Sequence, residues 1–457
     1  MKPNRLTHPP RYIQSLIFVL FAGLCVPGGS ASAAQPNIVF VLADDMGPGD
    51  LGCYGGTIEP TPNIDRLAKE GTRFTRYYAA APICSPSRCG LITGQFPARW
   101  NVTSFMQVRA GNRQCEQVDF LDPKAPSLPR VLKEAGYATA HIGKWHLGGG
   151  RDVVDAPKFA AYGYDVGLGS YESPEPAAAL GLKTVPWGPE NKREPQQVPR
   201  HDRSRWMVDE TLAFLKSHPD KPCFVNLWFD DVHAPWVPVN AEAGKERKNL
   251  AGVIAEFDKQ VGRLMDGLPT NTLLIFASDN GALPTFKGER SAGLRGSKLS
   301  LYEGGIRLPF IARWAGHVPA AGLDETTVIH AVDMLPTLAA IGGGRLPEGS
   351  AGDGQDHTAA LLGKPTVRAR PLFWEYGRNE TSFKYPAAPD RSPNVAMLDG
   401  KWKLLISADG TGAELYDLLA DAKESHNLAD TEIEKVATMK AAALAWRKAL
   451  PKLPPAP

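Results

Sequence analysis

Four strongly apolar stretches of this 457-residue chain each end abruptly in polar side chains. Continuous apolar runs rich in β-branched residues are typical of strands buried on both faces of a largely parallel sheet. The polar endings of such strands gather at one edge, where α/β proteins bind their ligands. The stretches are NIVFVLADD, YATAHIGKWH, CFVNLWFDDVH and NTLLIFASDN, and they end in Asp44 and Asp45, in Lys144 and His146, in Asp230, Asp231 and His233, and in Asp279 and Asn280.

Helical patterns alternate with these strands. TPNIDRLAKEG has an early proline and ends at Gly71, and SLPRVLKEAG has Ser127 as a candidate N-cap and ends at Gly136. The alternation predicts a doubly wound α/β sheet. A single strand that ends in Asp is more often followed by a turn or a capped helix than by a ligand site. We therefore leave Asp230 and Asp231 out of the predicted site, although the four endings together favour one.

The pattern changes after about residue 365. PLFWEY, the two halves of NVAMLDGKWKLLIS and GAELYDLLAD have the composition of short strands, and TEIEKVATMKAAALAWRKAL has helical spacing. The sequence thus predicts a catalytic domain over residues 35–365 and a small α+β domain over residues 366–457. Residues 1–34 are expected to be a signal peptide.

The first 34 residues have the features of an export signal. Basic residues precede the apolar stretch YIQSLIFVLFAGLCV, and small residues near Ala33 and Ala34 offer cleavage positions. An uncleaved anchor is the alternative, but the stretch is short for a span of about 20 residues. We expect an exported protein (periplasmic, secreted or at the cell surface, or lysosomal in a eukaryote) with no stable membrane span after cleavage.

Charge and cysteine content narrow the function classes. The chain has 51 basic and 49 acidic residues without a basic run, so we expect no nucleic-acid partner. Five cysteines remain once Cys25 is removed with the signal, and an odd count in an exported protein indicates one thiol with a separate fate. If that thiol is Cys84, the other four can pair in three ways or stay reduced: Cys53, Cys89, Cys115 and Cys223.

The candidate ligands Asp44, Asp45, Asp279 and Asn280 offer only oxygen atoms. Hard oxygen donors suit Ca²⁺ or Mg²⁺, whereas zinc sites normally include histidine or thiolate. Three converging carboxylates would repel one another strongly without a cation. The sequence therefore predicts a divalent cation between them.

A cysteine-rich turn, ICSPSRCGLITG, continues into an apolar run, so Pro86 can occupy the first turn of a helix. A reactive group at Cys84 would then face the positive end of that helix, which suits an anionic substrate. Arg88 adds a fixed positive charge. A Cys84–Cys89 disulfide or metal pair, a plain buried thiol and a thiolate nucleophile remain alternatives.

The run CSPSR, followed by Leu91, Thr93 and Gly94, resembles the signature of the type I sulfatases. The resemblance covers nearly all of the mature chain and implies an alkaline-phosphatase-like α/β/α sandwich with a large, mostly parallel sheet. It implies hydrolysis of a sulfate ester, most often on a carbohydrate, as in arylsulfatases and N-acetylgalactosamine-6-sulfatases. Blocks in family order are PNIVFVLADDMGPGDLGCYG, TPNIDRLAKEGTRFTRYYAAAPICSPSR, GYATAHIGKWHLG, FASDNGA, GSKLSLYEGGIRLPFI and LYDLLADAKESHNLA.

In that family a maturation enzyme oxidises the motif cysteine to Cα-formylglycine during export. The resemblance implies that Cys84 becomes an aldehyde hydrate, whose one hydroxyl attacks sulfur and whose other hydroxyl allows sulfate to leave by C–O cleavage. It also implies one calcium ion per chain rather than Mg²⁺. The implied ligands are Asp44, Asp45, Asp279, Asn280 and an oxygen of modified Cys84.

The resemblance assigns the remaining roles residue by residue. Arg88 would steady the hydrate and the metal-site carboxylates, and Lys144 and Lys298 would grip the sulfate oxygens. His146 would deprotonate the hydrate, and His233 would protonate the leaving oxygen. Taken alone, His146 could equally be a packed core histidine and Lys298 a solvated loop lysine.

One position departs from the family pattern. Many relatives have a second histidine in a His-x-Pro-His motif, where this chain has HAPW with Trp236. We hypothesise that the Trp236 ring stacks on a sugar of the substrate. Two other functions remain open: a formylglycine-dependent phosphonate or phosphodiester hydrolase of the same superfamily, and a non-catalytic glycan-binding relative. The Asp279–Asn280 pair, where phosphatases of this fold often have Asp–His, argues against a second metal.

Overall fold

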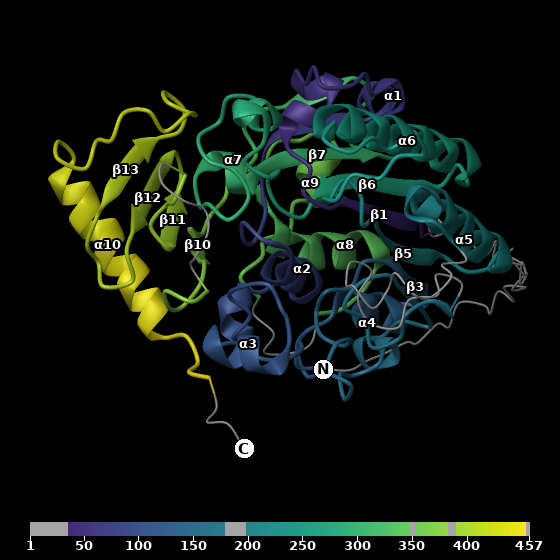
Figure 1. The fold of residues 1–457 in the computed structure, drawn as a ribbon, viewed down its shortest axis with the longest axis horizontal. Coiled ribbons are helices and arrows are strands. Elements are labelled where there is room, and N and C mark those ends of the chain that lie inside the picture. Colours follow the sequence, from purple (N-terminus) through teal and green to yellow (C-terminus); the bar gives the residue numbers. More distant parts are fainter. Residues whose placement is uncertain (1–34, 179–197, 347–351, 383–389, 454–457) are drawn as a thin grey trace, which may run out of the picture. The chain divides into compact units, whose positions relative to one another are not determined.

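A large mixed sheet forms the centre of the protein in the computed structural model, which describes residues 35–178, 198–346, 352–382 and 390–453 (Figure 1). The predicted signal peptide and its cleavage site lie outside these residues. The strand order is β4-β3-β5-β1-β6-β7-β2-β8, with β9 paired to β2. Bounds are β1 Asn37–Ala43, β2 Thr72–Tyr78, β3 Ala138–Gly143, β4 Val166–Gly169, β5 Cys223–Trp228, β6 Thr272–Ser278, β7 Arg307–Arg313, β8 Gly322–Asp324 and β9 Ile329–His330.

The four predicted strands are β1, β3, β5 and β6, and they are parallel neighbours in the middle of the sheet. Their registers align the ends of the strands, because Ala43 lies opposite Ser278 and Gly143 lies opposite Trp228. The polar residues that follow are therefore brought to one edge, as the sequence predicts. The antiparallel strand β7, between β6 and β2, makes the sheet mixed rather than wholly parallel.

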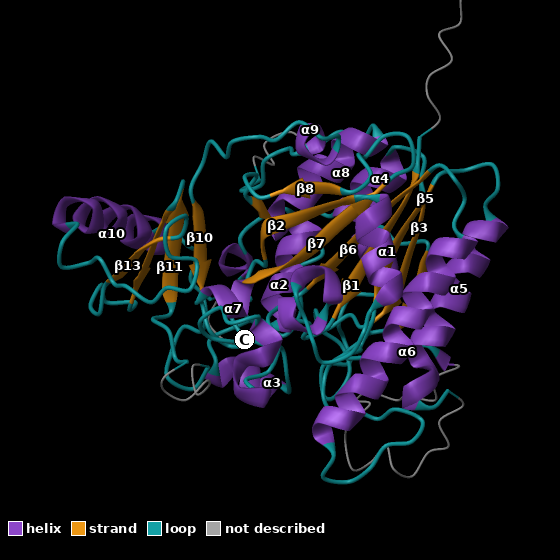
Figure 2. Ribbon diagram, turned by 90° about the horizontal axis from the view of Figure 1, so that it is seen from above, coloured by secondary structure: helices purple, strands orange, loops and turns teal. Residues whose placement is uncertain are grey.

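Helices cover both faces of the sheet, which confirms the predicted α/β architecture (Figure 2). Alternate residues of β1 face opposite sides: Phe40 shares one core with Leu132 of α4, and Val41 shares the other with Val261 of α6. The helices are α1 Pro62–Glu70, α2 Cys84–Thr93, α3 Arg109–Gln114, α4 Leu128–Glu134, α5 Arg203–Ser217, α6 Glu246–Gly267, α7 Glu303–Ile306, α8 Met334–Gly342, α9 Thr358–Leu361 and α10 Ile433–Lys448.

Helices α1 and α4 lie where the sequence predicts them, but Ser127 does not cap α4. Its hydroxyl donates a hydrogen bond to the carbonyl of Tyr162, 2.5 Å away, instead of accepting one from the first turn. Among the described helices, none is long and apolar enough to span a bilayer. Cys53, Cys84, Cys89 and Cys223 are all in the thiol form.

The predicted C-terminal strands form a second, antiparallel sheet in the order β10-β11-β12-β13, with bounds Leu372–Glu375, Val395–Asp399, Trp402–Ile406 and Glu414–Asp417. One face of this sheet packs on α10, through Leu404 and Met439 among others. Its other face shares a core with Tyr302 and Ile306 at the end of the large sheet. The domain boundary at residue 365 remains a prediction from the sequence.

A fully buried ion cluster joins the two sheets. Lys403 of β12 lies 2.8 Å from carboxylate oxygens of both Glu303, at the start of α7, and Glu424. The Glu424 carboxylate also accepts a 2.6 Å hydrogen bond from the backbone nitrogen of Glu303, and the Tyr78 hydroxyl donates to Glu303. The lysine is therefore the ion-pair partner that both buried acids share.

We expect Lys403→Met to lower the free energy of unfolding by about 3–5 kcal/mol, because removing one partner leaves buried acids uncompensated. Lys401→Met is the matched control, since the Lys401–Asp417 pair is half exposed and is worth less than about 1 kcal/mol. Thermal denaturation of the two variants measures the difference. Equal losses would mean that the buried cluster adds nothing specific.

Candidate active site

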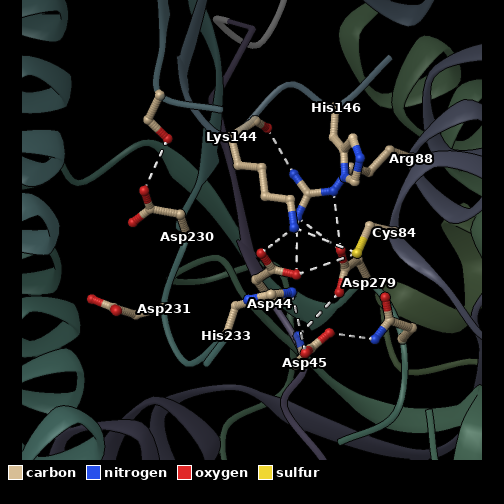
Figure 3. Close-up of polar contacts among 12 residues, drawn as sticks. Asp44, Asp45, Cys84, Arg88, Lys144, His146, Asp230, Asp231, His233 and Asp279 are labelled. Atoms are coloured by element: carbon tan, nitrogen blue, oxygen red, sulfur yellow. Dashed lines mark hydrogen bonds and ion pairs between the residues drawn. The ribbon is translucent and has the colours of Figure 1, made fainter. Parts of the chain in front are cut away.

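The predicted site residues meet at the carboxyl edge of the large sheet (Figure 3). Asp44 and Asp45 follow β1, Lys144 follows β3, and Asp279 follows β6. Cys84 is the first residue of α2, and Lys298 lies in the segment that precedes α7. Every predicted site residue except His233 is buried, so the charges of the site act where water screens them little.

Asp44 is surrounded by cations. The Lys144 ammonium lies 2.5 Å from its Oδ2, and the Arg88 guanidinium lies 3.7 Å from its Oδ1. Burial favours the neutral acid, but Lys144, His233 and Arg88 together hold the pKa of Asp44 well below its usual range. The carboxyl group is therefore a carboxylate at any physiological pH.

Asp45 is held by a second lysine. The Lys298 ammonium lies 2.6 and 2.8 Å from its two oxygens, and the Asn280 amide donates to Oδ1 at 2.8 Å. Although burial opposes ionisation, Lys298 and His233 lower the pKa of Asp45. Lys298 is itself buried, so it is not the solvated loop lysine of the alternative interpretation.

Asp279 is fixed by Arg88. The guanidinium donates from Nε and Nη2 to one carboxylate oxygen at 3.0 and 2.7 Å, and from Nη1 to the backbone carbonyl of Lys144 at 2.7 Å. It also lies over the Trp228 ring. Burial and the neighbouring Asp44 nonetheless raise the pKa of Asp279 to about 6. One rigid arginine thus connects α2 to the ends of β3 and β6.

The Cys84 thiol lies among these charges. Its sulfur is 3.4 Å from the Lys144 ammonium and 3.8 Å from Asp44 Oδ1. Burial raises the pKa of the thiol to about 11. Because the thiolate is the nucleophilic form, the side chain as encoded is a weak reagent at neutral pH.

The two predicted histidines approach from different sides. His146 Nε2 lies 3.1 Å from the Met106 carbonyl and therefore carries the proton, which leaves Nδ1 as a buried nitrogen without a protein partner. His233 Nδ1 lies 2.6 Å from the Ala234 carbonyl, and its Nε2 faces Asp45 Oδ2 at 3.7 Å. Burial lowers the pKa of both imidazoles.

The carboxylate and amide oxygens of the site fit a hard cation, and a thiol and an imidazole lie beside them. Asp44, Asp45, Cys84 and His233 each bring a ligand atom to within 4.8 Å of the others. Asn280 Oδ1 is buried without a protein partner, although its amide nitrogen is bonded. A buried carbonyl oxygen beside three carboxylates is an arrangement that a divalent cation satisfies.

A second charged cluster, which the sequence analysis left out of the site, lies beside it. Asp230 and Asp231 contact Arg200 at 3.2 and 3.5 Å, and Arg203 contacts Asp230 at 3.1 Å. The hydroxyl of Ser204 donates to Asp231 at 2.6 Å. These acids are thus salt-bridged rather than turned toward the cation site. No pattern around Arg200 indicates this pairing in the sequence.

The Trp236 hypothesis is wrong. The indole is only 8% exposed and belongs to the core between the sheet and the outer helices. Its Nε1 donates to the Val232 carbonyl at 2.8 Å, and its ring packs against Phe286 and Arg290. A ring enclosed in this way offers no face for a sugar to stack on.

Comparison with known proteins decides the family. The family model "Sulfatase" matches residues 36–344, and the model "N-sulphoglucosamine sulphohydrolase, C-terminal" matches residues 297–448. The chain belongs to the sulfatase family. This sulfatase is 33% identical to the N-acetylgalactosamine-6-O-sulfatase of Bacteroides thetaiotaomicron, over 89% of its own length and 92% of the relative's. It is 31% identical to human arylsulfatase A, over 91% and 86% of the two chains.

Solved structures agree with this assignment. A structure described with the metabolism of multiple glycosaminoglycans by B. thetaiotaomicron matches with a TM-score of 0.74 and 28% identity, over 91% of this sulfatase and all of that chain. The phosphonate monoester hydrolase of Agrobacterium radiobacter shares the fold, with a TM-score of 0.64, 20% identity and coverage of 91% and 96%. This sulfatase is a sulfuric ester hydrolase with the alkaline-phosphatase-like fold.

Because the Trp236 ring is a core element, we expect Trp236→Ala to destabilise the sulfatase by about 3–5 kcal/mol. The KM values for a sulfated glycan and for a small aryl sulfate should change by similar factors. Thermal denaturation and steady-state kinetics check the two expectations. An unchanged melting temperature with a selectively higher KM for the glycan would restore the stacking hypothesis.

Proposed function

We propose that this protein removes sulfate from a carbohydrate, with a formylglycine made from Cys84 and one calcium ion. The observation that carries the proposal is the position of Cys84, which lies at the start of α2 within 4 Å of both Asp44 and Lys144. The family gives the reaction class. The names of the relatives, one an N-acetylgalactosamine-6-O-sulfatase, support a sugar as the substrate.

The residues proposed to hold calcium are Asp44, Asp45, Asp279, Asn280 and an oxygen of the modified Cys84. Their fit rests on the unpartnered Asn280 oxygen and on the three carboxylates, which lie buried beside one another. A bound calcium ion would take its ligands from these oxygens and polarise an oxygen of the sulfate group. Mg²⁺ is the less favoured ion, because a set of five protein oxygens exceeds what Mg²⁺ usually takes from a protein.

The formylglycine hydrate would supply the hydroxyl that attacks sulfur. Arg88 would keep Asp279 and the Lys144 backbone in place through its three hydrogen bonds. Lys144, which pairs with Asp44, and Lys298, which pairs with Asp45, would bind the sulfate oxygens where charge develops. His146 would accept a proton at Nδ1, and His233 would donate one from Nε2 to the leaving sugar oxygen.

Export and maturation belong to the same proposal. The N-terminal residues have the composition of a signal peptide, and conversion of Cys84 requires a formylglycine-generating enzyme on the export route. The catalytic domain is proposed to cover residues 35–365, with residues 366–457 as a C-terminal domain. The phosphonate hydrolase alternative has no observation in its favour beyond the shared fold.

The proposal predicts a formylglycine at Cys84 and a preference for sulfate esters over phosphate esters. In protein co-expressed with the maturing enzyme, the Cys84 peptide should be lighter than the thiol form by the difference between –CH₂SH and –CHO. The protein should hydrolyse N-acetylgalactosamine 6-sulfate faster than the matched 6-phosphate. Peptide mass spectrometry and parallel kinetics measure both.

Cys84→Ala should abolish this activity. Cys89→Ala is the matched control, because Cys89 is a buried thiol one turn further along α2 and should be dispensable. An unmodified Cys84 in fully active enzyme would reject the formylglycine mechanism. Faster turnover of the phosphate ester would reject the assignment as a sulfatase, and a wider panel of sulfated disaccharides defines the sugar.

Calcium should stabilise the folded protein by mass action. After treatment with a chelator, Ca²⁺ at about 100 times its Kd should add about 2.7 kcal/mol and raise the melting temperature. Asp279→Asn should lose this response. Asp258→Asn, which alters a buried aspartate that binds the first turn of α1, should keep it. An equal Ca²⁺ shift in Asp279→Asn would place the ion elsewhere.

A further inference from the structure

The backbone that carries His233 is held by one buried arginine. Arg200 Nη2 donates to two carbonyls, that of Asp230 at 2.8 Å and that of His233 at 2.9 Å. The same guanidinium forms ion pairs with the Asp230 and Asp231 carboxylates. Arg200 therefore binds both ends of the turn between the end of β5 and the imidazole.

The other contacts of this turn connect it to the cation site. The carbonyl of Asp231 accepts a hydrogen bond from the backbone nitrogen of Asp44 at 3.0 Å. His233 Nδ1 contacts the Ala234 carbonyl, so Nε2 is the imidazole nitrogen that faces Asp45 in the cation site. The position of Nε2 relative to Asp44 and Asp45 thus depends on a short piece of backbone, and Arg200 fixes the His233 end of it.

We propose that Arg200 is a positioning residue for His233, which places the imidazole Nε2 beside the leaving oxygen of the sulfate ester. The inference rests on the proposed role of His233 as the acid. The planar guanidinium donates from one nitrogen to two carbonyls while its other nitrogen approaches a carboxylate, and the lysine ammonium, a point charge on a flexible stem, does not reproduce this fork. Arg200→Lys should therefore keep the charge and lose the geometry.

The effect of this change should depend on the leaving group. A poorly placed acid slows the ester of a weakly acidic alcohol or phenol most, because the anion of such a group leaves poorly unless it is protonated. We expect Arg200→Lys to lower kcat/KM for phenyl sulfate by about tenfold or more, since small misplacements of catalytic groups cost up to about 100-fold. For 4-nitrophenyl sulfate, the loss should stay within about threefold, because nitrophenolate leaves unaided.

Arg203→Lys is the matched control. Arg203 is buried in the same cluster and binds the Asp230 carboxylate at 3.1 Å. Its replacement disturbs the cluster without removing the bond to the His233 carbonyl. We expect similar losses for the two esters in this variant, and a melting temperature close to that of Arg200→Lys.

A readout independent of turnover is amide hydrogen exchange over residues 232–236. Exchange there should be faster in Arg200→Lys than in Arg203→Lys, because only the first change releases the His233 carbonyl. If Arg200→Lys does not fold, Asp230→Asn can be tested instead, because it weakens the ion pair that holds the Arg200 guanidinium. That variant should show the same selective loss for phenyl sulfate.

His233→Ala separates failure of this inference from failure of the proposed function. Selective loss for phenyl sulfate in both His233→Ala and Arg200→Lys supports the inference. Selective loss in His233→Ala alone, or equal exchange in the two arginine variants, overturns it. Uniform loss in His233→Ala would reject the histidine as the acid, and the role of Arg200 would be rejected with it.

Discussion

The active site depends on ion pairs between buried residues at the carboxyl ends of the central parallel strands. Three carboxylates, those of Asp44, Asp45 and Asp279, lie in an interior where their mutual repulsion is strong. Each acid has a specific cationic partner: Lys144 with Asp44, Lys298 with Asp45, and Arg88 with Asp279. Burial, and after it the neighbouring Asp44, raise the pKa of Asp279 even so. A site arranged in this way is suited to a dication and to an anionic substrate.

Much of this arrangement could be predicted from the sequence, because the signals involved are local. An apolar run long enough for a buried strand, with Asp44 or Asp279 directly after it, fixes both the strand and the edge at which the side chain emerges. The helix that begins at Cys84 is likewise indicated by Pro86 and by the apolar residues that follow. The antiparallel strand β7 was not predicted, since its pairing with β6 and β2 is set by contacts between distant segments.

The errors have the same origin. Nothing near Trp236 in the chain shows that Phe286 and Arg290, about fifty residues later, enclose its ring. Asp230 was left out of the site as a turn or helix-cap candidate, and it does lie outside the cation site, but the sequence did not indicate that its carboxylate pairs with Arg200, 30 residues earlier. Sequence reasoning identifies residue types that suit a chemistry. Which charged residues pair behind the site is decided by packing.

The ion cluster around Lys403 has a consequence for how the protein is made. Lys298 and Glu303 belong to one short segment, and Glu303 is bound by Lys403 and Glu424, 100 and 121 positions further along. The chain emerges from the ribosome N-terminus first, so Tyr78 is available to Glu303 early, whereas Lys403 and Glu424 become available only after β12 and residue 424 have emerged. A chain shortened before β12 would keep the Lys298–Asp45 pair but would lack the Lys403 ion pair that fixes Glu303, at the other end of the same segment.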